Sequence, residues 1–240
     1  MKKGVQLFKL ILNFFFPITC VCCGKHLPFD DVYRICPKCF DEIELIKGLF
    51  CKKCGKVLPD GGEHCYFCRK KPQYNFEYIR STGEYKGLLR KLIHLFKYKN
   101  SDYLDKLFAR LMIYTVEKEN EFSGVDLIVP VPIHWTKRIK RGFNQSELLA
   151  KRVAVYLERP LLKNILIRKK RTKSQYNLKR EDRFMNLKDS FVTKNSDIVR
   201  NKKILLIDDI STTCATINEC SRALRQAGSS GVFALTLARD

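Results

Sequence analysis

The chain has 240 residues, enough for one large domain and one small one, and 45% of them are hydrophobic, which allows a sizeable core. Its 46 lysines and arginines outnumber 25 aspartates and glutamates, giving a net charge of +21. That excess is high for an enzyme acting only on small metabolites. It favours a polyanionic partner, although a solvated basic surface would leave the same composition.

Residues 1–19 are predicted to form an N-terminal amphipathic helix. Its apolar side chains recur at helical spacing on one face: Leu7, Leu10, Ile11, Phe14 and Phe15. Polar residues interrupt the run, and no small-residue cleavage site follows it, so a secretion signal is not expected. The stretch is also too short and too polar to cross a bilayer. We expect this helix to dock on the body of the protein rather than on a membrane.

Residues 20–72 are predicted to form a double zinc ribbon. Nine of the eleven cysteines lie within the first 68 residues, and eight of the nine form Cys-x-x-Cys pairs. In sequence order these pairs make two quartets: Cys20, Cys23, Cys36 and Cys39, then Cys51, Cys54, Cys65 and Cys68. Disulfides would be the alternative in an oxidising compartment, but the glycine that follows Cys23 and Cys54 favours a metal.

Four thiolates fill every position around a tetrahedral zinc ion, so both predicted sites are structural rather than catalytic. Each would contribute about 10–16 kcal/mol of folding free energy to a segment that has few apolar residues of its own. Pairing in sequence order is an assumption at this point, because ribbons can also interleave. Zinc-bound thiolates place the protein in a reducing cytoplasm.

Residues 73–240 alternate between strand and helix patterns, which predicts an α/β domain with a parallel sheet. A strand and turn are expected at 76–85, helices at 88–98 and 104–116, and a buried strand at 126–131. After that strand we expect a basic loop that carries Arg138 and Arg141, then a helix capped by Asn144. A strand, a basic loop and a helix in this order form a candidate anion site, and an ordinary capped turn is the alternative.

Residues 168–183 are predicted to be a long polar loop. Eight of the sixteen are lysine or arginine, and the only apolar side chains are Tyr176 and Leu178. In a compact domain such a loop is usually a lid or a binding loop, and a solvated loop without a function is the alternative.

The central motif spans residues 204–219. Four aliphatic residues, 204–207, predict a strand buried on both faces, and Asp208 and Asp209 follow it. Small and hydroxylated residues come next, before a helical pattern that stops at Gly228: Ser211, Thr212, Thr213, Cys214, Ala215 and Thr216. Small residues and a helix N-terminus suit a phosphate, and adjacent acids suit hydroxyls or Mg²⁺. The motif therefore predicts a sugar-phosphate site, with a polar-capped strand, turn and helix as the alternative.

This motif resembles the phosphoribosyl pyrophosphate motif of type I phosphoribosyltransferases. Other stretches resemble the ComF family of competence proteins, and together they cover nearly the whole chain: Pro-Val-Pro at 130–132, Arg-Gly-Phe-Asn-Gln at 141–145, the spaced set Gln175, Leu178, Arg183 and Asn186, and the cysteine-rich N-terminus. The resemblance implies a fold in which a type I phosphoribosyltransferase-like domain follows a small double zinc ribbon.

The resemblance also implies roles for single residues. Asp208 and Asp209 would be the catalytic acids that hold the ribose hydroxyls of phosphoribosyl pyrophosphate, directly or through Mg²⁺. The loop formed by Thr212, Thr213, Cys214, Ala215 and Thr216 would hold the 5′-phosphate. Arg138 and Arg141 would contact the pyrophosphate, and the polar loop at 168–183 would be a flap over the site.

One position departs from the family pattern, which usually has glycine where this chain has Cys214. If the backbone there needs a positive φ, cysteine costs about 1–2 kcal/mol of strain. Replacing Cys214 by glycine is then expected to leave ligand binding unchanged or to tighten it.

Two functions follow from the resemblance. The first is a DNA-uptake role in natural transformation, in which the protein binds phosphoribosyl pyrophosphate and single-stranded DNA and works with other competence proteins. Aromatic residues near the basic runs could then stack on bases: Trp135, Phe143 and Tyr176. The second is an active phosphoribosyltransferase of nucleotide or related metabolism, with no nucleic-acid role.

Overall fold

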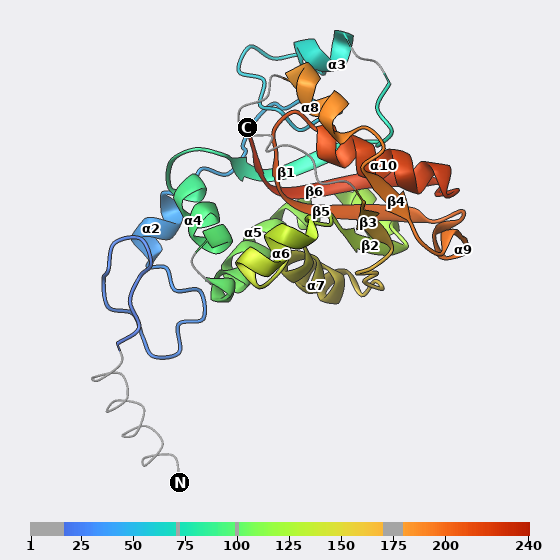
Figure 1. The fold of residues 1–240 in the computed structure, drawn as a ribbon. Coiled ribbons are helices and arrows are strands. Elements are labelled where there is room, and N and C mark those ends of the chain that lie inside the picture. Colours follow the sequence, from blue (N-terminus) through green and yellow to red (C-terminus); the bar gives the residue numbers. More distant parts are fainter. Residues whose placement is uncertain (1–16, 71–72, 99–100, 170–179) are drawn as a thin grey trace.

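The computed structural model describes residues 17–70, 73–98, 101–169 and 180–240 (Figure 1). The helix predicted over residues 1–19 therefore lies almost entirely outside the described residues, as does the middle of the predicted flap at 170–179.

A four-stranded parallel sheet forms the centre of the large domain. It contains β1 (Ile79–Glu84), β2 (Leu127–Pro130), β5 (Lys203–Ser211) and β6 (Gly231–Arg239), in the order β1-β6-β5-β2. Residues 204–207 of β5 are fully buried. They pair with β2 on one side, where Leu127 lies opposite Ile204, and with β6 on the other, where Ile204 lies opposite Val232. The predicted parallel sheet is confirmed, with the aliphatic strand at its centre.

Helices cover both faces of the sheet. On one face lie α4 (Gly87–Tyr98), α5 (Asp105–Lys118) and α7 (Gln145–Leu157), and on the other lies α10 (Ala215–Gln226) (Figure 1). Successive side chains of β5 point to opposite faces. Leu205 and Ile207 accordingly join the core with α4, α5 and α7, whereas Ile204 and Leu206 join the core with α10.

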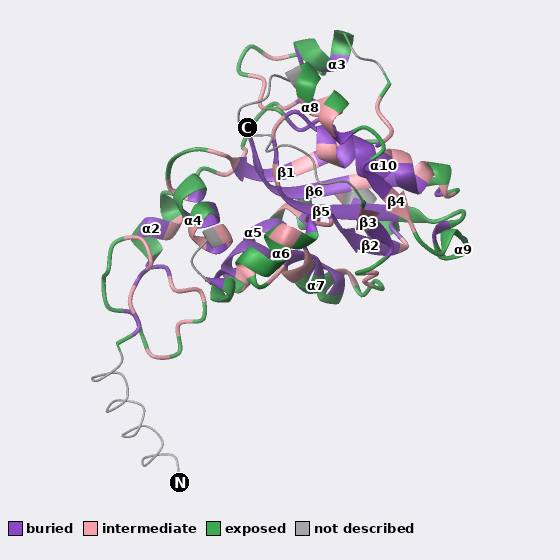
Figure 2. Cartoon of the chain, in the orientation of Figure 1, coloured by how far each residue is buried: buried purple, intermediate pink, exposed green. Residues whose placement is uncertain are grey.

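Short elements complete the described chain. They are α2 (Pro37–Asp41), α3 (Tyr66–Lys70), η1 (Asp102–Leu104), η2 (Asn120–Gly124), α6 (Trp135–Arg141), α8 (Arg180–Leu187), α9 (Ser196–Val199), and the antiparallel pair β3 (Leu166–Arg168) and β4 (Phe191–Thr193). Figure 2 shows that burial is concentrated in the sheet and in the inward sides of its helices, while α3, α9 and much of α6 face solvent.

Two loop predictions are wrong in part. The basic stretch after β2 is a helix, α6, which ends at Gly142 in the left-handed conformation with φ of 81°. Residue 168 belongs to β3, and residues 180–183 begin α8, so the predicted long loop is shorter at both ends. Helix propensity explains α6 and the start of α8, because lysine and arginine are good helix formers even where their charge suggests a loop. Arg168 is in a strand instead, because β3 pairs with β4.

The two cysteine quartets pack on opposite faces of the sheet. Cys20, Cys36 and Cys39 belong to the core that contains α4 and α5, whereas the second quartet belongs to the core that contains α10. Segments from both ribbons cover the outer edge of β1, where the Ile46 N–H donates to the Thr82 carbonyl and the Ile79 N–H donates to the Lys53 carbonyl. The ribbons thus satisfy an edge strand that would otherwise be exposed.

Candidate ligand site at the carboxyl ends of β2 and β5

Asp208 and Asp209 lie toward the carboxyl end of β5, and each residue is only 9% exposed. One oxygen of Asp208, Oδ1, accepts hydrogen bonds from Ser146 Oγ and from the Asp209 N–H, both at 2.9 Å. Burial and the neighbouring charge of Asp209 raise the pKa of Asp208 to about 7, although these two hydrogen bonds and Lys97 oppose the rise. A pKa near 7 means that Asp208 is partly protonated at neutral pH even with a cation beside the acid pair.

The cation beside the acid pair is Lys97, at the end of α4. Its Nζ lies 2.8 Å from Asp209 Oδ2. Burial lowers the pKa of Lys97, but Asp209 and Asp208 outweigh that effect and hold it above its usual value. From the sequence, Lys97 was expected on the basic, solvated face of its helix. Two adjacent buried acids need a cationic partner, so the sequence indicates that such a partner exists. Helical periodicity does not show which lysine or arginine it is.

Ser146 reaches Asp208 because of the turn after β2. Asn144 caps α7 as predicted: its side chain accepts from the Ser146 N–H at 3.2 Å and donates to the Val131 carbonyl at 3.1 Å. Because β2 and β5 are paired neighbours, their two following turns meet at one edge of the sheet. Sequence reasoning missed Ser146, since a serine in a first helical turn is common.

The loop after β5 makes a left-handed turn directly before α10. Cys214 has a φ of 67°, in the left-handed region. The backbone there thus has the positive φ at which cysteine is strained relative to glycine. The turn places residues 212–216 directly before and within the first turn of α10. The N–H groups of a first helical turn lack intrahelical acceptors, so they can bind an anion.

Several basic side chains lie within electrostatic reach of one another near the acids. Partial desolvation of the exposed Lys137 lowers its pKa, and the charges of Arg168, Arg141 and Lys97 lower it further. Arg141 donates to Gln145 Oε1 at 3.1 Å, and its contact with a pyrophosphate stays a prediction. Arg138 instead lies 3.8 Å from Glu147 with most of its side chain exposed. Lys137 was not singled out from the sequence.

Helix α8, which follows the predicted flap in the sequence, contacts the loop after β5. Arg183 Nη1 donates to Thr212 Oγ1 at 2.7 Å. Of the spaced family set, Arg183 therefore touches the predicted phosphate loop, while Gln175 and Leu178 lie outside the described residues.

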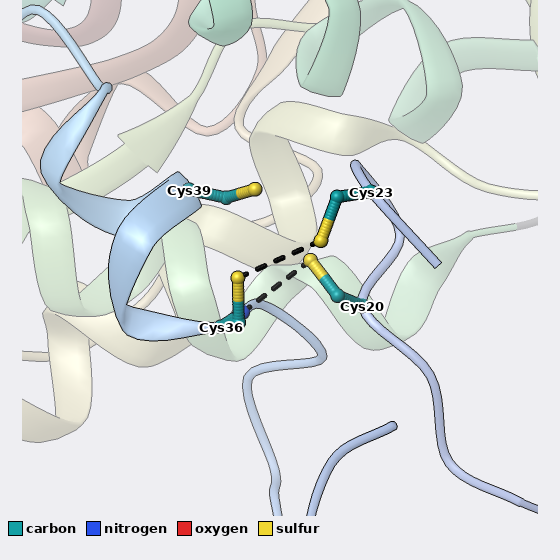
Figure 3. Close-up of side chains that lie close together, drawn as sticks. All are labelled: Cys20, Cys23, Cys36 and Cys39. Carbon is teal, nitrogen blue, oxygen red and sulfur yellow. Dashed lines mark hydrogen bonds between the residues drawn. The ribbon is translucent and has the colours of Figure 1, made fainter. Parts of the chain in front are cut away.

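The first cysteine quartet has the geometry of a metal site. The sulfurs of Cys20, Cys23, Cys36 and Cys39 all lie within 4.8 Å of one another (Figure 3). Cys23 Sγ lies 3.7 Å from Cys36 Sγ, and the Cys36 N–H donates to Cys20 Sγ at 3.4 Å. Four thiolates at about 2.3 Å from a tetrahedral zinc ion would be about 3.8 Å apart, so these residues fit zinc.

The second quartet fits in the same way. Its four sulfurs also lie within 4.8 Å of one another, with 3.7 Å between Cys54 Sγ and Cys65 Sγ. The glycines after each first pair, Gly24 and Gly55, take φ of 75° and 71°. These values let each tight turn present two sulfurs to one point. Two cysteine tetrads, paired in sequence order rather than interleaved, support two zinc sites.

Within the part of the chain that the structure describes, no helix is long and apolar enough to cross a membrane.

Comparison with known proteins supplies the family. A family model described as a double zinc ribbon domain matches residues 11–69. Competence protein F of Haemophilus influenzae is 32% identical over 231 residues, which cover 94% of this chain and 98% of that protein. DNA utilization protein YhgH of Escherichia coli is 29% identical over 93% of this chain and 97% of its own length. Competence protein ComFC of Streptococcus pneumoniae is 27% identical over 92% of this chain and 100% of its own length. Given this similarity over nearly its whole length, the chain belongs to the ComF family of competence proteins.

Proposed function

We propose that this protein acts in DNA uptake or utilisation, and that it binds phosphoribosyl pyrophosphate with Mg²⁺ in the site between β2 and β5. The names of its relatives support the first part. One observation carries the second part: a buried acid pair, a left-handed turn at a helix N-terminus and a group of cations meet at one edge of the sheet. Each of the three matches a different part of a phosphorylated ribose.

In this proposal the carboxylates of Asp208 and Asp209 accept hydrogen bonds from the ribose hydroxyls. Residues 212–216 and the first turn of α10 hold the 5′-phosphate. Arg141 and Lys137 neutralise the pyrophosphate, with Arg138 as an outer contact. Bound Mg²⁺ would supply further charge neutralisation, and the carboxylate oxygens of the acid pair are the ligands it prefers.

Lys97 gives the acid pair a cation before any ligand arrives. Its ammonium lies 2.8 Å from Asp209 Oδ2 and orients that carboxylate. When a ligand hydroxyl or Mg²⁺ takes Asp209 Oδ2, the ammonium becomes available to the phosphate groups nearby.

Titration calorimetry of the zinc-loaded protein with phosphoribosyl pyrophosphate and Mg²⁺ tests the ligand. The parent should bind, and the double variant Asp208→Asn, Asp209→Asn should not. Asp197→Asn is a matched control, because Asp197 is a largely exposed aspartate on α9 that pairs with the neighbouring Arg200 and takes no part in the site. Binding of equal strength by the parent and the double variant would show that the acids do not form the site.

We further propose that single-stranded DNA is the polyanionic partner. Helix α6 exposes Trp135 (64% exposed) and Ile139 (74% exposed) beside Lys137 and Lys140. An exposed indole on a lysine-rich helix can stack on a base while the ammonium groups neutralise phosphates. Phe143, also considered for stacking, is instead half-buried and packs on Phe96 with ring centroids 5.7 Å apart. Tyr176 lies outside the described residues.

Fluorescence anisotropy with a labelled oligonucleotide at rising salt tests this partner. The logarithm of affinity should fall with the logarithm of salt by about 0.7 for each phosphate neutralised. Lys140→Gln with Lys169→Gln should flatten that slope, whereas Trp135→Ala should weaken binding without changing the slope. Tyr114→Ala, at an exposed aromatic on α5, is the control. Absence of binding at low salt would remove the nucleic-acid role.

The alternative is an active phosphoribosyltransferase without a nucleic-acid role, and the intact acid pair favours it. Pyrophosphate release from phosphoribosyl pyrophosphate on addition of an acceptor would support it. For either function we propose a reducing cytoplasm, because both tetrads need their cysteines as thiolates.

A further inference from the structure

Arg239, the last residue of β6, lies between the second cysteine tetrad and the phosphate loop. Its side chain is almost fully buried, at 4% exposure of the residue. Toward the ribbon, Nε donates to the Cys54 carbonyl at 3.1 Å, and Nη2 lies 3.8 Å from Cys54 Sγ. Toward the loop, Nη1 donates to the Ser211 carbonyl at 2.8 Å and also contacts the carbonyls of Thr212 and Asp240. One guanidinium thus binds both parts of the protein.

Cys214 makes a second connection between the same two parts. It is 3% exposed, and its sulfur accepts from Ser211 Oγ at 3.6 Å. It also belongs to the same buried cluster as Cys54, a cysteine of the tetrad. The residue with the left-handed backbone at the centre of the loop therefore packs in the core that contains a predicted metal ligand.

These contacts bear directly on a metal site. A group that hydrogen-bonds to a ligating atom orients that ligand, and its loss typically costs about 10–100-fold in metal affinity. Arginine is suited to this position because its planar fork can donate to several acceptors at once while staying charged. The arrangement also fixes the loop, since the carbonyls of Ser211 and Thr212 both accept from Arg239.

We propose that the second tetrad and the phosphate loop are one linked unit, joined by a bridge that consists of Arg239, Cys214 and Cys54. Metal at the second tetrad holds Cys54 in place, and the bridge then holds residues 211–214 in the conformation that binds a phosphate. Because linkage is reciprocal, a ligand on the loop retains the metal by the same factor. The ligand half of this inference rests on the proposed function, and the metal half does not. Arg239 acts here as a positioning residue.

The first tetrad provides an internal reference. It lies in the other core, with α4 and α5, so changes to the bridge should affect one zinc ion and leave the other unchanged. Release of zinc from the full-length protein to a colorimetric chelator reports both ions.

Three variants separate the contributions. Arg239→Met removes the guanidinium. Cys214→Ala removes the sulfur but keeps a side chain at positive φ, so backbone strain is unchanged. Arg80→Met is the matched control, because Arg80 donates to the ribbon carbonyl of Lys52 at 2.9 Å and pairs with Glu119 rather than with a tetrad cysteine. Arg239→Lys, which keeps the charge and loses the fork, serves if the methionine variant does not fold by circular dichroism.

We expect Arg239→Met to release one of the two zinc ions about tenfold faster than the parent, with the other ion and the Arg80→Met control unchanged. Phosphoribosyl pyrophosphate with Mg²⁺ should slow release of that same ion in the parent, and this protection should shrink in Cys214→Ala. Equal release rates in the parent and Arg239→Met would overturn the bridge. Ligand binding by calorimetry without any effect on zinc release would overturn the linkage. Faster release from Arg239→Met in a protein that binds no phosphoribosyl pyrophosphate would support the bridge and refute the proposed ligand.

Discussion

Replacing Asp208 by asparagine should make the protein more stable at alkaline pH while removing its ligand site. The side chain is buried, and burial with the charge of Asp209 raises its pKa from 3.8 to about 7. A carboxyl whose pKa is raised on folding binds its proton more tightly in the folded state. Its contribution to stability is therefore complete below the unfolded pKa of about 3.8 and is lost as pH rises through about 7.

The size of the effect follows from the two pKa values. Between about pH 5.5 and pH 8, ionisation of Asp208 should cost the parent about 2 kcal/mol of unfolding free energy. Asparagine cannot ionise, and its Oδ1 can still accept from Ser146 Oγ and the Asp209 N–H. The difference in stability between variant and parent should thus grow by about 2 kcal/mol over this window in favour of the variant.

Urea denaturation of the zinc-loaded parent and Asp208→Asn at both pH values measures this difference. All other titrating groups are shared, so their effects largely cancel when the two proteins are subtracted. A stability difference that is independent of pH would show that Asp208 is ionised throughout the window, with Lys97 as a sufficient counter-charge. In that case the acid pair would not lower the stability of the protein in return for ligand binding.

Three further outcomes are expected. Metal analysis should find two zinc ions per chain, and a strong chelator should unfold the ribbons; less than one zinc per chain would contradict the tetrads. Cys214→Gly should be more stable than Cys214→Ala by about 1 kcal/mol in urea denaturation, because only alanine keeps the strain at φ of 67°. The glycine variant should also bind phosphoribosyl pyrophosphate at least as tightly as the parent. Equal stabilities of the two variants would mean that this turn is unstrained. Gly55→Ala should destabilise the protein more than Gly62→Ala, since both take positive φ but only at Gly55 would a Cβ lie 2.8 Å from the Ile79 carbonyl oxygen; equal losses in a thermal unfolding assay would show that the second ribbon does not pack tightly on β1.

Elements set by local pattern were predictable. The aliphatic run at 204–207 is the central strand, and Asn144 caps α7, because burial on both faces and capping depend on residues close in sequence. The spacing of the cysteine pairs likewise indicated two metal sites. Local pattern failed at α6 and at residues 180–183, where charge suggested loops and helix propensity prevailed, and at residue 168, which pairs in a strand.

Contacts between distant parts of the chain came only from the tertiary structure. Lys97 meets Asp209 because α4 packs on the face of the sheet where β5 ends, and Arg239 meets Cys54 because β6 lies between β5 and the edge strand that carries the second ribbon. Sequential pairing of the cysteines was also decided at this level. The sequence determines which side chains can ionise, cap or bind metal. Strand order and layer packing determine which of them meet, because a buried charge or thiolate takes its partner from whatever element the fold brings within hydrogen-bond distance.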